Sequence, residues 1–216
     1  MPRNMNIFIN RPNLIVRSLD NTKRFYRFLD PGWYLYRKVV LETNIVNKFN
    51  DEFIELVYVT LVAWNMNSRG AKLADFNVFK TSLLSFKDNF INLSNFKLEE
   101  LSSTMFDDLL NNDLLKLFFG LELVANNKPK LVTYSKTFHF FLPNLFVPID
   151  RKYTLNYFNG HTNIPKSIEK QFDLFKHLHQ NFRKFSNEVS LNEYLDQTWN
   201  ANIPKTIDNI IIGYQL

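Results

Sequence analysis

A lysine and an aspartate are the residues of this chain whose types and spacing most readily suggest chemistry. Lys136 and Asp150 stand on either side of an apolar connector, residues 142–149. An amine and a carboxylate that converge in one cleft can act together, the amine as nucleophile or phosphate contact and the carboxylate as base or electrostatic stabiliser. The spacing therefore predicts a candidate catalytic pair. The structural alternative is a solvated lysine and an aspartate that only caps a helix.

A second candidate is an arginine in a polar loop between two apolar segments. Arg69 precedes Gly70 within residues 65–72, so a guanidinium and an open backbone could approach an anion such as a phosphate. The alternative is a simple interhelical loop in which Gly70 takes a positive φ. Arg69 gains interest if folding brings it near Asp150 or Arg151.

The chain offers little for a metal or a cofactor. It has no cysteine, which removes thiolate ligands, thiol nucleophiles and disulfides together. His177 and His179 are two residues apart and would point in different directions on a helix. No phosphate-binding glycine loop, dinucleotide fingerprint or nucleophile elbow occurs. We therefore expect no metal and no cofactor, and classes that depend on nucleotide cofactors are disfavoured.

Helical patterns surround the candidate pair. Residues 134–141 are expected to form a short buried helix that carries Lys136 and ends at Leu142-Pro143. Asp150 is expected to cap a helix over residues 151–158, closed by Asn159-Gly160. After Pro165 comes the longest amphipathic pattern, whose apolar residues recur at steps of three and four. They are Ile168, Phe172, Phe175, Leu178, Phe182 and Phe185.

Other segments are less uniform. Asp30-Pro31-Gly32 is interpreted as a turn that ends a short helix. Residues 33–46 fit either a strand or a buried helix, and the final run 207–212 fits either as well, although Pro204 favours a helix start. Helices are expected from Asp51, from Asp75 and from about Thr104.

The composition favours an all-α fold. The 22 phenylalanines outnumber the nine tyrosines and three tryptophans combined, and phenylalanine has no polar group to keep it at a wet surface. Five glycines and eight prolines leave few connections, and no alternating strand pattern is sustained. We predict a single orthogonal array of helices around a Phe-rich core, with residues 1–216 as one domain that could divide into sub-lobes 1–125 and 126–216.

The chain is expected to be cytoplasmic. Its first residues show no signal-peptide pattern, and the longest apolar stretch, residues 53–64, is too short to span a bilayer. A membrane partner is therefore not expected. The net charge of +5 permits contact with nucleic acid, although it also suits simple solubility. The sequence does not indicate an oligomeric state.

The region around the pair resembles a known family. Within residues 132–158, the stretch Tyr134-Ser135-Lys136-Thr137, followed by the connector and Asp150, is similar to the part of helix-hairpin-helix DNA glycosylases that carries their catalytic lysine and aspartate. The resemblance implies that Lys136 and Asp150 hold those roles and that double-stranded DNA is the partner. The residues then expected to contact nucleic acid are Arg69, Lys72, Lys128, Lys130 and Arg151.

In that family a hairpin before the lysine presents backbone amides to phosphate and contains closely spaced glycines. The equivalent residues here, 126–134, contain no glycine, and Asp150 lies fourteen positions after Lys136. Our leading hypothesis is a DNA-associated helical protein, either a diverged base-excision-type glycosylase or a related DNA-binding protein. The alternative is a non-enzymatic module for protein interaction or scaffolding, in which Lys136 and Asp150 lie far apart or outside any cleft.

Overall fold

The computed structural model describes residues 3–26, 30–68, 71–196 and 198–216. Helices dominate this part of the chain, where the only β pairing is an isolated antiparallel bridge between Leu73 and Val124. The all-α expectation is confirmed. The α-helices are α1 (Pro12–Phe25), α2 (Pro31–Leu41), α3 (Asp51–Ala63), α4 (Phe76–Ser85), α5 (Lys87–Leu93), α6 (Ser103–Leu109), α7 (Leu115–Gly120), α8 (Leu131–Phe141), α9 (Asn156–Asn159), α10 (Ile168–Glu188) and α11 (Ile203–Tyr214).

Short 3₁₀ and π turns join these helices. The 3₁₀ turns are η1 (Met5–Phe8), η2 (Asn47–Phe49), η3 (Leu98–Glu100) and η6 (Leu191–Tyr194). Two segments are π-helical, η4 (Leu110–Leu114) and η5 (Arg151–Leu155). The helix expected from Thr104 is therefore α6 and α7 with a π segment between them, and it begins after Ser102, whose hydroxyl accepts from the amide of Met105.

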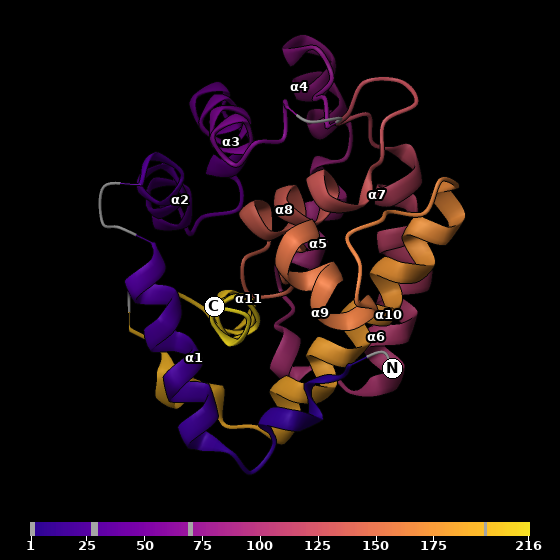
Figure 1. The fold of residues 1–216 in the computed structure, drawn as a ribbon. Helices are drawn as coiled ribbons and strands as arrows, with labels where there is room; N and C mark the ends of the chain where they lie inside the picture. The colour runs from indigo at the N-terminus through magenta and orange to yellow at the C-terminus, as the bar shows by residue number, and fades with distance from the viewer. Residues whose placement is uncertain (1–2, 27–29, 69–70, 197) are drawn as a thin grey trace.

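Helix α8 is the centre of the molecule (Figure 1). Every residue of α8 is buried, and both α3 and α10 pack against it. Its Phe138 ring contacts Phe175 of α10, and its Phe141 ring contacts Phe53 of α3 and Phe90 of α5. Because phenylalanine removes a large apolar area from water, these contacts supply much of the driving force for folding. The Phe-rich core is confirmed.

The first helix packs along the last one. Helices α1 and α11 lie side by side (Figure 1), and they contact one another more extensively than any other pair. A Cβ added at Gly213 would stand 1.7 Å from the backbone oxygen of Ser18, so only glycine allows this approach. This packing joins the two sub-lobes that the sequence suggested, while the division of the chain into domains stays a prediction.

The interpretation of Asp30-Pro31-Gly32 as a helix end is wrong. The carboxylate of Asp30 accepts from the amide of Trp33 at 2.9 Å, and Pro31 is the first residue of α2. An aspartate followed by proline suits the start of a helix, because the cap fills one free amide and proline lacks another. Residues 33–41 are therefore helical, and so is the final run, which begins after the cap Asn202.

None of the helices in the described ranges has both the length and the apolarity that crossing a membrane would require.

The buried polar groups of the core include two histidines. His139 binds the hydroxyl of Tyr36 at 2.8 Å, and His179 stacks on Phe175 with ring centroids 4.0 Å apart. Burial lowers the pKa of His139 to about 3 and that of His179 to about 4.

These two histidines make stability depend on pH. An unfolded chain protonates them near pH 6.5, whereas the folded core keeps them neutral, so their contribution is present above pH 6.5 and is lost as pH falls towards 4. Each histidine contributes a slope of up to about 1.4 kcal/mol per pH unit. Urea unfolding between pH 7 and pH 4.5 should show this loss. His179→Gln should flatten the slope, whereas the exposed His161→Gln should leave it unchanged; equal slopes in all three proteins would contradict the assignment.

Candidate functional site

Two side chains of α8 hold the apolar connector, residues 142–149, along the helix. The hydroxyl of Ser135 accepts from the amide of Ile149 at 3.0 Å, and Nδ1 of His139 lies 2.7 Å from the carbonyl oxygen of Phe146. Because Ser135 and His139 are four residues apart, they share one face of α8. The connector therefore runs back along the helix and returns the chain to the level of Lys136.

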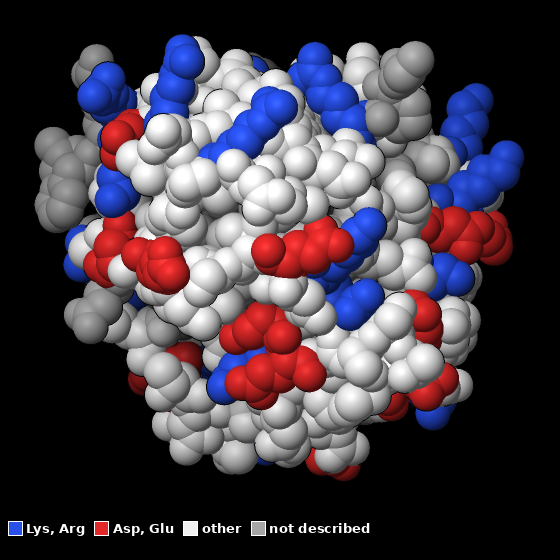
Figure 2. All heavy atoms as spheres, turned by 90° about the horizontal axis from the view of Figure 1, so that it is seen from below, with Lys and Arg blue, Asp and Glu red and all other residues white. Residues whose placement is uncertain are grey.

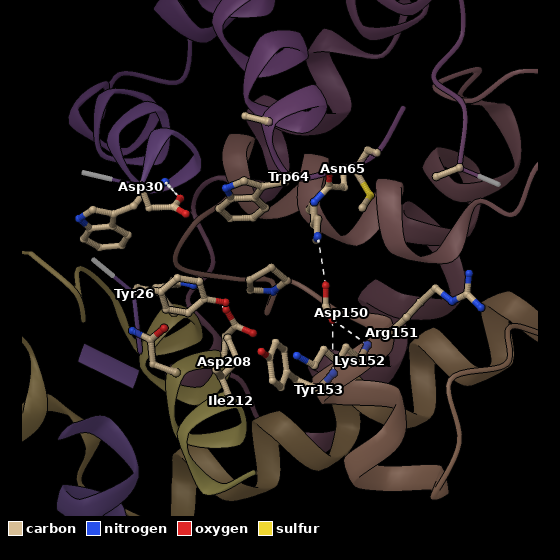
Figure 3. Close-up of a pocket in the computed structure, with 18 of the residues that line it drawn as sticks. Tyr26, Asp30, Trp64, Asn65, Asp150, Arg151, Lys152, Tyr153, Asp208 and Ile212 are labelled. Atoms are coloured by element: carbon tan, nitrogen blue, oxygen red, sulfur yellow. Dashed lines mark hydrogen bonds and ion pairs between the residues drawn. The ribbon is translucent and has the colours of Figure 1, made fainter. Parts of the chain in front are cut away.

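Asp150 is fixed where the connector ends. One carboxylate oxygen accepts from the amides of Lys152 at 2.7 Å and Tyr153 at 3.3 Å, so Asp150 caps η5 as the sequence predicted. Its own amide donates to Thr154. The other carboxylate oxygen lies 3.4 Å from Nζ of Lys136 (Figure 3). Asp150 therefore caps a helix and also pairs with Lys136. The alternative of a solvated lysine beside an aspartate that only caps a helix does not agree with this geometry.

The charge state of Asp150 follows from these contacts. Burial by itself would raise the pKa of this carboxyl. The charge of Lys136 and the amides of Lys152 and Tyr153 outweigh burial and hold the pKa below its ordinary value. Asp150 is therefore ionised at neutral pH and suits a role as a fixed negative charge.

The side chain of Lys136 is buried but borders a cavity. Its side chain is only 6% exposed, and its ammonium lies 5.1 Å from the centre of the Trp64 ring. Lys136 and Asp150 both line a cavity of about 610 Å³. This volume lies within the range of ligand pockets, which combine apolar walls with a few convergent polar groups.

Aromatic rings form much of the cavity wall. All three tryptophans of the chain line it, together with Tyr26 and Tyr153. Trp33 and Trp199 stack with centroids 4.2 Å apart. The indole nitrogen of Trp64 donates to the carbonyl of Gly32, where an added Cβ would stand 2.8 Å from the indole. Such flat, rigid walls suit a planar ligand, which can stack on them.

A second lysine–aspartate pair lines the same cavity. On α11, Nζ of Lys205 lies 2.6 Å from a carboxylate oxygen of Asp208, and the two side chains are 8% and 6% exposed. Sequence reasoning missed this pair and the three tryptophans. The i, i+3 spacing of Lys205 and Asp208 has meaning only in a helix, and the sequence left this segment undecided between helix and strand. No local pattern in the sequence indicates that the three tryptophans share one wall.

The expected nucleic-acid contacts fall in different places. Arg151 lines the cavity and donates from Nε to the carbonyl of Thr162 at 3.0 Å. Lys72 and Lys128 are exposed on adjoining segments, where the amide of Ala125 donates to the carbonyl of Lys72. Arg69 lies outside the described residues, although Ser68 and Ala71 on either side of it line the cavity.

Lys130 forms hydrogen bonds within the protein. Its ammonium donates to the carbonyl oxygens of Phe118, Phe119 and Leu121 and so satisfies the carboxyl end of α7. The amides of Lys130 and Leu131 donate to the side chain of Gln171. The ammonium of Lys130 and these two amides are thus satisfied within the protein, whereas the side chain of Lys128 is exposed.

An asparagine takes the left-handed conformation in residues 126–134, which contain no glycine. Asn127 has φ of 63°, in the left-handed region that glycine usually fills and that asparagine tolerates better than most residues. The turn can therefore form in residues 126–134 without a glycine.

Across the described residues, no three histidine, aspartate or glutamate side chains lie close enough together to hold a metal ion.

The surface carries mixed charge. On the face shown in Figure 2, acidic and basic side chains are interspersed, with several lysines or arginines along one edge. Mixed charge of this kind favours solubility and does not by itself define a binding face.

Comparison with family models, curated proteins and solved structures finds no match to this chain. The geometry of the site is therefore the basis on which function can be argued.

The two contacts of Asp150 can be separated by substitution. Asp150→Asn keeps a capping oxygen, whereas Asp150→Ala removes it, and both remove the charge. We expect Asp150→Asn to be more stable than Asp150→Ala by about 1 kcal/mol in urea unfolding. At exposed Asp20, inside α1, the order should reverse because alanine is the better helix former. Equal stability of the two Asp150 variants would show that the cap contributes nothing.

Proposed function

We propose that this protein is DNA-associated and acts on a nucleotide inserted into the aromatic cavity, with Lys136 and Asp150 as the reacting pair. The observation that carries the proposal is their convergence. The ammonium and the carboxylate lie 3.4 Å apart in the wall of a cavity lined by every tryptophan of the chain. The alternative of a non-enzymatic module expects the two residues to lie apart or outside any cleft, and this geometry does not favour it.

The proposed chemistry assigns each residue a distinct role. As the bond between C1′ of the sugar and the base nitrogen breaks, the electron pair leaves with the base and positive charge develops on the sugar. The ionised Asp150 stabilises that charge. Lys136 releases a proton to the departing base, and its neutral amine bonds to C1′. Asp150 is unchanged at the end of this step.

The surroundings of the pair support this use. The stacked rings of Trp33 and Trp199 offer a flat surface to a base, and Arg151 stands in the cavity wall as a phosphate contact. Lys72 and Lys128 are exposed on adjoining segments and are the further cations proposed to contact the DNA backbone. The π-helical turn η5, directly after Asp150, is a geometry that occurs often at functional sites.

Borohydride trapping on abasic duplex DNA tests Lys136 without knowledge of the preferred base. The aldehyde of the abasic sugar condenses with a lysine amine and releases water, and borohydride reduces the resulting imine to a stable adduct. The protein should form this adduct, and Lys136→Gln should abolish it. Lys152→Gln, which removes an exposed ammonium of the same cavity, should not. No adduct with the unaltered protein, or an undiminished adduct with Lys136→Gln, would refute the assignment.

Electrophoretic shifts across a salt series test the DNA association. Affinity should fall steeply as salt rises, because bound lysines release counterions from the phosphates. Lys128→Gln should lower the slope of log K against log salt by about 1. Lys130→Gln should leave the slope unchanged and lower the free energy of unfolding, because its ammonium caps α7. Absence of any shift at low salt would contradict the proposal.

A further inference from the structure

The Lys205–Asp208 pair has no part in the chemistry proposed for Lys136 and Asp150. Both charges are almost completely buried, and removing an ion from water costs several kcal/mol even when it is paired. An apolar pair of similar size is often as stable or more stable. The fold alone therefore gives no reason for a buried ion pair at this point of α11.

The pair presents both kinds of polar group to the cavity. Lys205 occupies one carboxylate oxygen of Asp208, and no hydrogen bond to the other oxygen is found from the described residues. The hydroxyl of Tyr26, which also lines the cavity, points towards this carboxylate (Figure 3). The ammonium of Lys205 lies 5.4 Å from the Tyr36 ring and 5.7 Å from the Trp64 ring. Rings do not replace the hydrogen-bond acceptors that an ammonium has in water.

We propose that Lys205 and Asp208 recognise the lactam edge of a planar heterocycle, in which a carbonyl oxygen stands beside a ring N–H. An ammonium can only donate and an ionised carboxylate can only accept. Lys205 therefore suits the carbonyl oxygen and Asp208 the N–H. The ring would stack on the aromatic wall to which Trp64 belongs, with its polar edge directed at α11.

The environment of Asp208 favours a ligand of this kind. Burial raises the pKa of this carboxyl, Lys205 opposes the rise, and the charge of Asp150 adds to it. A ligand N–H would supply the hydrogen bond that water supplies to an exposed carboxylate. A ligand without that N–H would give no hydrogen bond to the second carboxylate oxygen, and a site with buried polar groups discriminates strongly against such analogues.

This inference rests on the proposed function for the idea that the cavity takes a base, but it requires no reaction at Lys136. Because all three tryptophans line the cavity, intrinsic tryptophan fluorescence reports on it directly. Suitable probes are 2′-deoxyinosine, which has the lactam edge, and the deoxyriboside of unsubstituted purine, which lacks it. We expect a saturable change with deoxyinosine and at least about tenfold weaker binding of the purine deoxyriboside.

The variant Lys205→Met/Asp208→Leu replaces the ion pair by apolar side chains of similar size. It should retain the free energy of unfolding of the unaltered protein and bind deoxyinosine at least about tenfold more weakly. The matched control is Lys80→Met/Asp51→Leu, which removes an ion pair of the same 2.6 Å length away from the cavity and should not alter binding. The single variant Asp208→Asn keeps the shape, loses the charge and should also weaken binding.

Absence of a saturable fluorescence change with deoxyinosine, or equal affinity in Lys205→Met/Asp208→Leu, would overturn the inference. The two proposals fail separately. If deoxyinosine binding depends on Lys205 and Asp208 but no abasic-site adduct forms, the reaction proposed at Lys136 is refuted and the recognition site is supported. If an adduct forms through Lys136 but deoxyinosine binding does not depend on Lys205 and Asp208, the recognition site is refuted and the reaction at Lys136 is supported.

Discussion

The hydrogen bonds that hold the connector along α8 are the constraint on which the site depends. Ser135 and His139 are buried polar side chains, and each would be costly if left unpaired. They form hydrogen bonds with backbone groups of the connector, and these bonds offset the cost of burying both the side chains and the backbone groups. The same bonds bring the chain back beside Lys136 and place Asp150 there. Without them, the separation of fourteen residues would carry no geometric meaning.

Two carboxylates of one cavity are tuned in opposite directions. Asp150 is partly exposed and receives two backbone amides as well as Lys136, so its pKa is lowered. Asp208 is paired with one lysine and is almost completely buried, so its pKa is raised. When the pKa values of neighbouring titratable groups are shifted in opposite directions, the groups are suited to different tasks. The lowered pKa keeps Asp150 charged, which suits the charge stabilisation proposed for it. The recognition role proposed for Asp208 rests on its pairing with Lys205 in the cavity wall.

Local chemistry in the sequence predicted several elements well. The buried helix that carries Lys136, the cap at Asp150, the left-handed Gly160 after α9 and the apolar stripe of α10 all depend on residues within a few positions of one another. The errors arose where a local signal has two meanings. Asp30-Pro31-Gly32 can end one helix or begin the next, and here the carboxylate of Asp30 caps α2, with Pro31 as its first residue.

By itself the sequence determined the all-α class, the Phe-rich core and the candidates Lys136 and Asp150, because periodicity, capping and burial preference are short-range properties. Only the tertiary structure decided that Trp33, Trp64 and Trp199 form one wall and that Lys205 and Asp208 join the same cavity. It also decided that the ammonium of Lys130 is used to cap α7. Residues so far apart in the chain meet through the packing of whole helices, and no local pattern encodes which helices become neighbours.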